Sequence, residues 1–194
     1  MSWSRRLTQI LAPLGLGAGL ATGASAATVA LPAALASLSP TWGDARAGVW
    51  EGKTEAADPL VVRRLAEDAV IDDAAGAKAA IAPSASPLAD PGVPGVGVWL
   101  FRVAQTPSGL TYVGVRRLSL DGAPWQVEVT CREQGTTGVR EAVLLDRALG
   151  DGSVSFEGGA LTWRVPPDDP RYDAEFPTHP LSRCRKVLGA LAGG

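Results

Sequence analysis

The chain contains no asparagine and only one histidine among its 194 residues. Without asparagine there is no acceptor for N-glycosylation, and no Asn side chain can complete an oxyanion hole or orient a catalytic base. A Ser-His-Asp or Cys-His hydrolase would have to use His179, which lies between Thr178 and Pro180. The G-x-S-x-G motif is absent as well, so the sequence argues against several common hydrolytic activities.

A strong excess of charge of one sign is also missing. The formal net charge is −2 at pH 7 and the sequence pI is about 5.4, so there is no general electrostatic attraction to nucleic acid or acidic lipid. By contrast, 46% of the residues are apolar, which predicts a folded globular protein. A chain of this length can bury a core without a metal ion or a dense set of disulfides.

The first 26 residues have the three parts of an export signal. A pair of arginines supplies the positive start, residues 7–21 form a short apolar stretch, and Ala24-Ser25-Ala26 provides the small residues that a signal peptidase requires. We predict that residues 1–26 are a cleaved signal peptide and that the protein is periplasmic or extracellular. Apolar character resumes in residues 28–38, so the alternative is an uncleaved segment that anchors the chain in the inner membrane.

Residues 27–95 are predicted to form an N-terminal extension, with a short edge strand over residues 47–50. A helix is expected to begin at Asp58-Pro59, because Asp is a favoured N-cap and Pro is favoured at the first helical position, and to end near Gly76. Residues 74–95 are rich in Ala, Pro, Ser and Gly, which predicts a linker or an irregular loop before the main sheet.

Residues 96–194 are predicted to form the main domain. Three successive strands are expected, the first apolar on both faces as in a strand covered on both sides, and the turns between them are short. They cover residues 96–104, 110–120 and 125–132. The apolar period then changes to that of a helix, and a β-hairpin with a Gly-Gly turn follows. These two elements cover residues 138–149 and 154–165. The predicted fold is α+β, an antiparallel sheet of about five strands with one or two helices packed on a face.

Only two cysteines are present, Cys131 and Cys184, and an even number in an exported chain predicts a disulfide. Cys131 lies on the same side of its predicted strand as the core residues. The bridge would close a loop that spans 53 positions, and on the chain-entropy model it would stabilise the fold by about 3–4 kcal/mol. A redox-active pair is the alternative, but the C-x-x-C spacing is absent, and two cysteines with one histidine match no known metal-ligand spacing.

The candidate for catalysis is the acidic, proline-rich segment that contains His179. In this hypothesis Asp173 is the carboxylate that works with the imidazole. A hydrolase of this kind would place His179 in a cleft, within hydrogen-bond reach of a carboxylate and a nucleophile. No serine stands out as that nucleophile, and a disulfide would remove both thiols.

The candidates for binding are tryptophans outside the predicted sheet and clustered basic side chains. Trp42 and Trp50 are candidates for an interface, whereas Trp99, Trp125 and Trp163 lie in predicted strands and are expected in the core. The basic candidates would face an anionic partner or lipid head groups, or would simply be solvated. They are Arg116, Arg117, Arg183, Arg185 and Lys186.

These features predict an exported, non-catalytic binding or structural protein, an accessory subunit of an envelope or membrane complex. Its partner is expected to be another envelope or membrane protein, with peripheral or anchored membrane association; no cofactor, metal or nucleic acid is expected. One alternative is a periplasmic carrier of a small apolar ligand, with Trp99, Trp125 and Trp163 lining a concave sheet face. The other is a small periplasmic hydrolase that uses His179.

Overall fold

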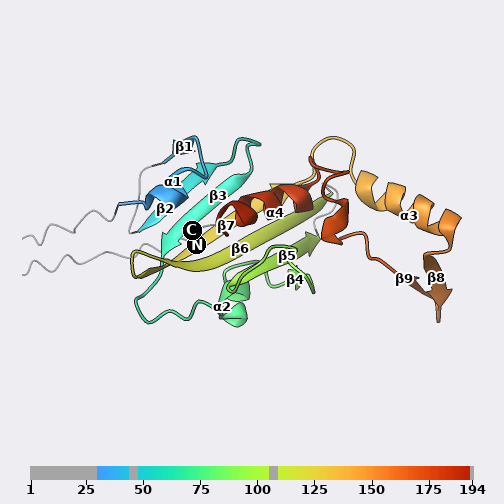
Figure 1. Ribbon diagram of the computed structural model, residues 1–194, viewed down its shortest axis with the longest axis horizontal. Coiled ribbons are helices and arrows are strands. Elements are labelled where there is room, and N and C mark those ends of the chain that lie inside the picture. Colours follow the sequence, from blue (N-terminus) through green and yellow to red (C-terminus); the bar gives the residue numbers. More distant parts are fainter. Residues whose placement is uncertain (1–29, 44–47, 105–108, 193–194) are drawn as a thin grey trace, which may run out of the picture.

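An antiparallel sheet of seven strands dominates the computed structural model, which describes residues 30–43, 48–104 and 109–192 (Figure 1). The strands are β1 (Thr41–Trp42), β2 (Val49–Lys53), β3 (Pro59–Arg64), β4 (Ser86–Pro87), β5 (Val98–Ala104), β6 (Leu110–Leu120) and β7 (Ala123–Arg132). Their order across the sheet is β1-β2-β3-β7-β6-β5-β4, and each neighbouring pair is antiparallel. A separate hairpin pairs β8 (Val154–Glu157) with β9 (Ala160–Trp163). The protein is therefore an α+β protein built on an antiparallel sheet.

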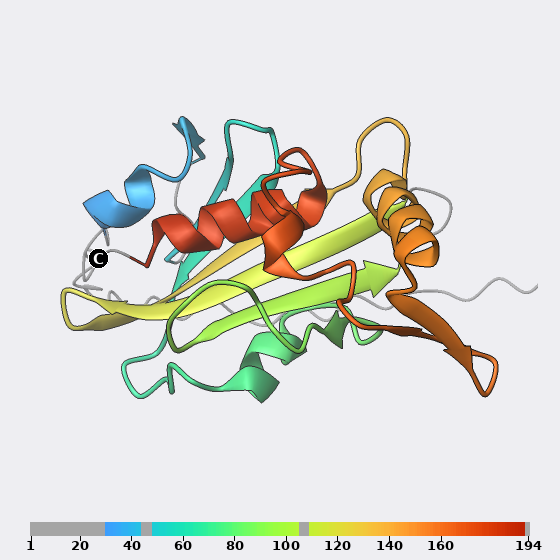
Figure 2. The ribbon, with the colours of Figure 1, turned by 45° about the vertical axis from the view of Figure 1, so that its right-hand side comes forward.

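The helices differ in how they meet this sheet. Those in the described residues are α1 (Ala33–Ala36), α2 (Ala74–Ala79), α3 (Val139–Asp151), a short 3-10 helix η1 (Pro170–Tyr172) and α4 (Pro180–Ala190). α4 lies along one face of the sheet, over β6 and β7 (Figure 2). α3 and the β8–β9 hairpin lie at one end of the sheet and project away from it in both views.

The two faces of the sheet carry separate hydrophobic clusters. The larger cluster lies between the sheet and α4 and includes Leu100 and Leu188. The smaller one, on the opposite face, includes Phe101 and Ala77 of α2. Because successive residues of a strand point to opposite faces, β5 contributes to both clusters. The prediction that this strand is covered on both sides is confirmed.

Close approach of α4 to the sheet depends on Gly114 in β6. A Cβ atom at this position would lie 2.8 Å from Leu188 Cδ1, which is closer than real Cβ contacts allow. Glycine therefore lets the helix sit directly on the strand.

The central elements are confirmed. The three predicted strands are β5, β6 and β7, and the helix predicted over residues 138–149 is α3. The β8–β9 turn has φ angles of 58° at Gly158 and 83° at Gly159, which is the left-handed backbone that a two-residue hairpin turn requires.

The helix predicted from Asp58 to Gly76 is wrong. Residues 59–64 form β3, which pairs with β7. The side chains of Leu60 and Val62 are buried in the core. Branched side chains such as Val61 and Val62 fit a pleated sheet better than a helix. Asp58 does not cap a helix, because its carboxylate accepts hydrogen bonds from Arg183 on α4.

The sheet contains strands from both sides of residue 95, where the sequence predicted a boundary between an extension and a main domain. The strands β1, β2 and β3 come from the extension and join the same sheet as β5 to β7. The Pro-rich segment is not wholly irregular, since it contains α2, capped by Asp73, and β4, which pairs with β5. Prolines exclude long elements there, but short elements form between them.

The residues from Pro180 to Ala190 form α4, a helix that is not among the elements predicted above. Its apolar residues recur at the spacing of a helix, and Pro180 occupies the first helical position. These apolar residues are Leu181, Cys184, Leu188 and Leu191. The helical signal is present in the sequence, but the run of prolines before it points to irregular structure.

The predicted signal peptide, residues 1–26, lies outside the described residues, so export stays a prediction. Among the helices that the structure does describe, none has the length and apolar character needed to cross a bilayer.

Candidate functional site

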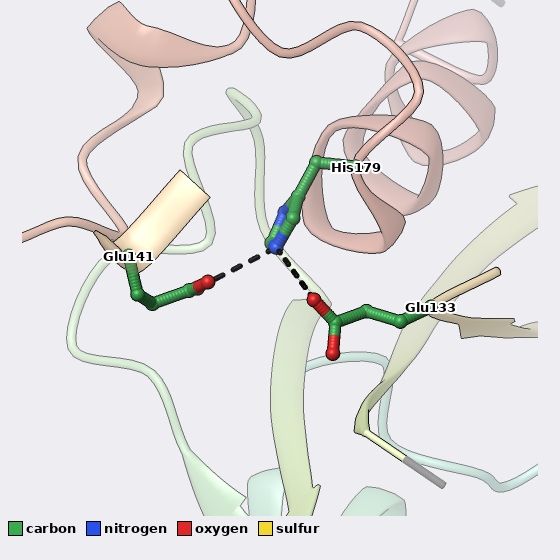
Figure 3. Close-up of side chains that lie close together, drawn as sticks. All are labelled: Glu133, Glu141 and His179. Carbon is green, nitrogen blue, oxygen red and sulfur yellow. Dashed lines mark ion pairs between the residues drawn. The ribbon is translucent and has the colours of Figure 1, made fainter. Parts of the chain in front are cut away.

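Three side chains that are far apart in the sequence meet beside the start of α4 (Figure 3). Glu133 directly follows β7, Glu141 lies in the first turn of α3, and His179 is the N-cap of α4. His179 Nε2 lies 3.5 Å from Glu141 Oε1 and 4.0 Å from Glu133 Oε1. We call these three residues the His–Glu cluster.

Backbone amides hold the Glu133 carboxylate in place. Its Oε2 accepts a hydrogen bond of 2.6 Å from Leu110 N, and its Oε1 accepts one of 2.7 Å from Gly138 N. Gly138 precedes α3 and has a φ of 72°, a left-handed conformation that glycine adopts without strain. Glu133 therefore ties the end of β7 to the start of β6 and to the start of α3.

His179 is only 8% exposed, and its two ring nitrogens have different surroundings. Nδ1 accepts a hydrogen bond of 3.3 Å from Leu181 N and so caps α4. A neutral imidazole that accepts at Nδ1 carries its proton on Nε2, which points between the two glutamates. Nε2 lies at ion-pair distance from both glutamates, but it has no hydrogen-bond partner of good geometry among the described residues.

Glu141 is the most exposed member of the His–Glu cluster. Burial raises the pKa of its carboxyl, but the His179 imidazole and the positive charge of Arg140 outweigh this effect, so the pKa lies below its ordinary value. Glu141 therefore contributes a negative charge at neutral pH.

The His–Glu cluster borders a cavity of about 170 Å³, lined by Glu133 and His179. The hydroxyl-bearing side chains of Thr136 and Thr178 and the ring of Phe176 also line it. A cavity of this size can hold water or a small ion but is below the range of pockets for drug-sized ligands.

The predicted pair of His179 with Asp173 is wrong. Asp173 Oδ1 accepts hydrogen bonds from Arg140 at 2.8 Å, from Ser182 at 3.0 Å and from Arg185 at 3.1 Å. This carboxylate therefore balances two buried guanidinium groups. Among the described residues, no serine or cysteine hydrogen-bonds to the His179 imidazole, so the structure does not bring a nucleophile to it.

Three arginines predicted as binding residues are internal. Arg116, Arg117 and Arg185 are all buried, and each donates to carbonyl or side-chain oxygens of the fold. They join elements of the structure, so the interpretations as an anion-binding surface and as solvated charges are both wrong for them. Lys186, by contrast, is exposed.

Arg183 lines a larger cavity of about 540 Å³, between α4 and the residues that precede β1. It is not a free cation, because its guanidinium forms two hydrogen bonds of 2.9 Å with the buried carboxylate of Asp58. This pairing raises the pKa of Arg183. Leu38 and Val187 form apolar walls of the cavity, and the exposed Lys186 also lines it. We call this cavity the α4 groove.

The prediction that Trp42 and Trp50 lie outside the sheet is wrong. Trp50 is in β2, and its buried ring lies 5.4 Å from that of Trp125. Trp42 is in β1, and its Nε1 donates a hydrogen bond of 2.9 Å to a carbonyl of α1. Trp99 packs on the opposite face of the sheet from Trp125, and Trp163 belongs to the separate hairpin. The three tryptophans of the carrier hypothesis therefore do not line one concave face.

Cys131 and Cys184 lie side by side in the core, beneath α4. Both are fully buried thiols in this structure, with their sulfur atoms 2.7 Å apart. The hydrogen bond with Cys184 and burial raise the pKa of the Cys131 thiol well above its usual range. The predicted partners thus meet, while the disulfide itself stays a prediction.

Tyr112 packs against His179, and the pKa of its hydroxyl tests how strongly this site is buried. Their rings pack edge to face with centroids 5.8 Å apart. Burial raises the pKa of Tyr112 from 10.0 to about 12, although the positive charge of Arg102 opposes the shift. The folded protein thus holds this proton more tightly than the unfolded chain, and stability falls as the pH rises from about 10 to about 12.

We expect this effect to amount to about 2–3 kcal/mol, and Tyr112→Phe should remove it. The measurement is urea unfolding of both proteins at several pH values between 8 and 12. If the difference in unfolding free energy between them does not change across this interval, Tyr112 titrates alike in the folded and unfolded states.

Sequence reasoning identified His179 but missed both glutamates. Glu133 follows a strand and Glu141 begins a helix, and nothing in their spacing relates them to each other or to His179. Only the packing of α3 and α4 against the end of β7 brings the three residues together. A search for single-segment motifs has no means of finding such a site.

No protein-family model matches the chain, and neither a curated protein nor a solved structure does. Its function therefore has to be inferred from its own residues.

Proposed function

We propose that this chain is an exported, non-catalytic binding protein, an accessory subunit of an envelope complex, that docks on a protein partner through residues 139–163. We call this segment the arm; it comprises α3 and the β8–β9 hairpin. The observation that supports the proposal is that apolar side chains of the arm face solvent.

The uncovered side of α3 carries three large apolar side chains. Val139, Val143 and Leu149 are 45%, 41% and 56% exposed, and their spacing spreads them across this side of the helix, with the exposed Asp146 among them. Leu144, on the other side, is buried. Phe156 of the adjoining hairpin is 71% exposed. Several exposed large apolar side chains on one projecting element are typical of a protein interaction site.

The charges beside these apolar residues indicate what kind of partner fits. Asp146, Asp151 and Glu157 are exposed on the arm, and its one exposed basic residue, Arg147, is paired with Glu175 at 3.0 Å. Helices that bind membrane surfaces carry Lys and Arg, so an anionic bilayer is disfavoured. A second copy of the same acidic arm would also be repelled. The chemistry favours a different protein, with an apolar groove and a basic rim.

Val143→Asp is expected to reduce co-purification of that partner at least about tenfold, because it places a charge in the centre of a desolvated contact. The measurement is tagged purification after mild-detergent extraction of the envelope, with quantitative mass spectrometry of the stoichiometric partners. Circular dichroism checks that the variant is folded.

Val70→Asp is the matched control. Val70 is 64% exposed, in the loop between β3 and α2, which lies at the opposite end of the sheet from α3. This variant should retain the partner. Equal loss of the partner in both variants would contradict docking through the arm.

The α4 groove supports a second candidate function, binding of a small molecule. Its volume of about 540 Å³ lies within the usual range for ligand pockets, and it combines apolar walls with the charge of Lys186. The same purification separates the two candidates. A monomer that carries a small molecule and no protein partner would favour the groove over the arm.

A further inference from the structure

We propose that the His–Glu cluster binds a divalent transition-metal ion, with Zn²⁺ the best match. The ligand atoms offered by Glu133, Glu141 and His179 all lie within 4.8 Å of one another. His179 adds an independent indication of a ligand, because its buried Nε2 points between the two carboxylates and has no hydrogen bond of good geometry to any described residue. Buried polar atoms are rarely left without a partner.

The distances are close to those of a metal site. In a tetrahedral zinc site with bonds of 2.0–2.1 Å, neighbouring ligand atoms are about 3.3 Å apart. Here Nε2 lies 3.5 Å and 4.0 Å from the two carboxylate oxygens. A rotation of Glu141, the most exposed of the three side chains, would shorten the first separation, and shortening the second requires a shift of His179 or Glu133.

The charges also favour a cation. Two carboxylates approach each other here, beside an imidazole that is neutral when it accepts at Nδ1. Arg140 lines the same cavity, but its guanidinium is already bound to Asp173 and to two backbone carbonyls. A divalent ion would neutralise the pair of glutamates without disturbing that arrangement.

Glu133 is already held in position by the fold, because both of its oxygens accept backbone hydrogen bonds. Hydrogen bonds to a ligating carboxylate orient it and raise the affinity of a site. The His179 ring packs against Tyr112.

The ligand set selects the type of ion. Calcium takes six to eight oxygen ligands, and Mg²⁺ also prefers oxygen, whereas an imidazole with two carboxylates suits zinc and its neighbours in the first transition series. Three protein ligands leave a fourth position open, and the adjoining cavity of about 170 Å³ has room for a water molecule.

Metal binding changes the cap of α4. Ligation through Nε2 requires the imidazole proton to reside on Nδ1, which then no longer accepts a hydrogen bond from Leu181 N. Zn²⁺ should therefore shift the amide resonance of Leu181, a signal that does not depend on any activity of the protein.

The test is isothermal titration calorimetry of ZnCl₂ into the purified protein and into a C131A/C184A variant, in which no thiol can bind the metal. His179→Asn removes the ligand and keeps a favoured N-cap residue, so the start of α4 is preserved. Glu141→Gln removes one charge. We expect both changes to weaken Zn²⁺ binding by about 100-fold or more. Glu175→Gln, an exposed carboxylate outside the cluster, should leave binding unchanged.

Saturable binding that is lost in both cluster variants, together with the Leu181 shift, would support the site. A wild-type dissociation constant above millimolar, or a His179→Asn variant that binds Zn²⁺ as tightly as the wild type, would overturn it. Neither result bears on docking through the arm, because the apolar residues tested there are not part of the cluster.

Discussion

Replacing Arg140 with leucine is expected to lower the free energy of unfolding by about 3–5 kcal/mol, because several oxygen acceptors lose the fully buried guanidinium that donates to them. The Arg140 side chain is fully buried and donates to Asp173, Ser182 and the carbonyls of Pro167 and Asp169. It therefore joins α3 to the segment before α4. The melting temperature should fall by roughly 10 °C for a protein of this size.

Arg147→Leu is the matched control, since Arg147 is on the same helix and also pairs with a carboxylate of the 167–179 segment. This pair, with Glu175, is at the surface, where the two side chains are 52% and 45% exposed. Exposed pairs contribute at most about 1 kcal/mol. Urea unfolding of the two variants measures the contrast. Similar losses in both would mean that burial of Arg140 does not determine its contribution.

Reduction of the Cys131–Cys184 pair is expected to lower the free energy of unfolding by about 3–4 kcal/mol, if the protein is oxidised as predicted for an exported chain. The two sulfur atoms already lie 2.7 Å apart, one on β7 and one on α4, and the residues are separated by 53 positions. A bond between them would restrict the unfolded chain and hold α4 to the sheet. Guanidinium unfolding with and without a reducing agent measures the difference.

The C131A/C184A variant provides the control for this effect. Its stability should not respond to the reducing agent, which separates the disulfide from other effects of reduction. Intact mass of the protein should also rise by two hydrogens on reduction. Two free thiols in protein isolated without reductant would show that the disulfide prediction is wrong, and α4 would then be held to the sheet by packing and hydrogen bonds without a covalent bond.

The centre of the fold could be predicted because its determinants are local. The strands β5, β6 and β7 follow one another with short turns, and their apolar pattern is readable without knowing the rest of the protein. The same is true of α3, which Gly152 ends with a φ of 72°, and of the Gly158-Gly159 hairpin. In each case the residues that determine the element lie within it.

The errors arise where distant residues decide between two local options. Asp58-Pro59 followed by apolar residues fits a helix start. In the folded protein, however, the segment forms hydrogen bonds with the edge of β7, and the Asp58 carboxylate accepts a hydrogen bond from Arg183. α4 was missed for a related reason, because the prolines before it are typical of irregular structure. Its apolar face is stabilised by contact with β6 and β7.

The sequence by itself determined the class of the fold and the order of its central strands, because strand period and turn residues are local properties. It also predicted that the two cysteines are partners, and the structure places their sulfur atoms 2.7 Å apart. Only the tertiary structure decided which charged residues are internal, since an arginine beside Asp173 and an arginine in solvent have the same sequence signature. It also decided where the candidate sites lie. Glu133, Glu141 and His179 come from three different parts of the chain. The apolar residues of α3 have the spacing of a core face, but the sheet leaves one side of the helix uncovered.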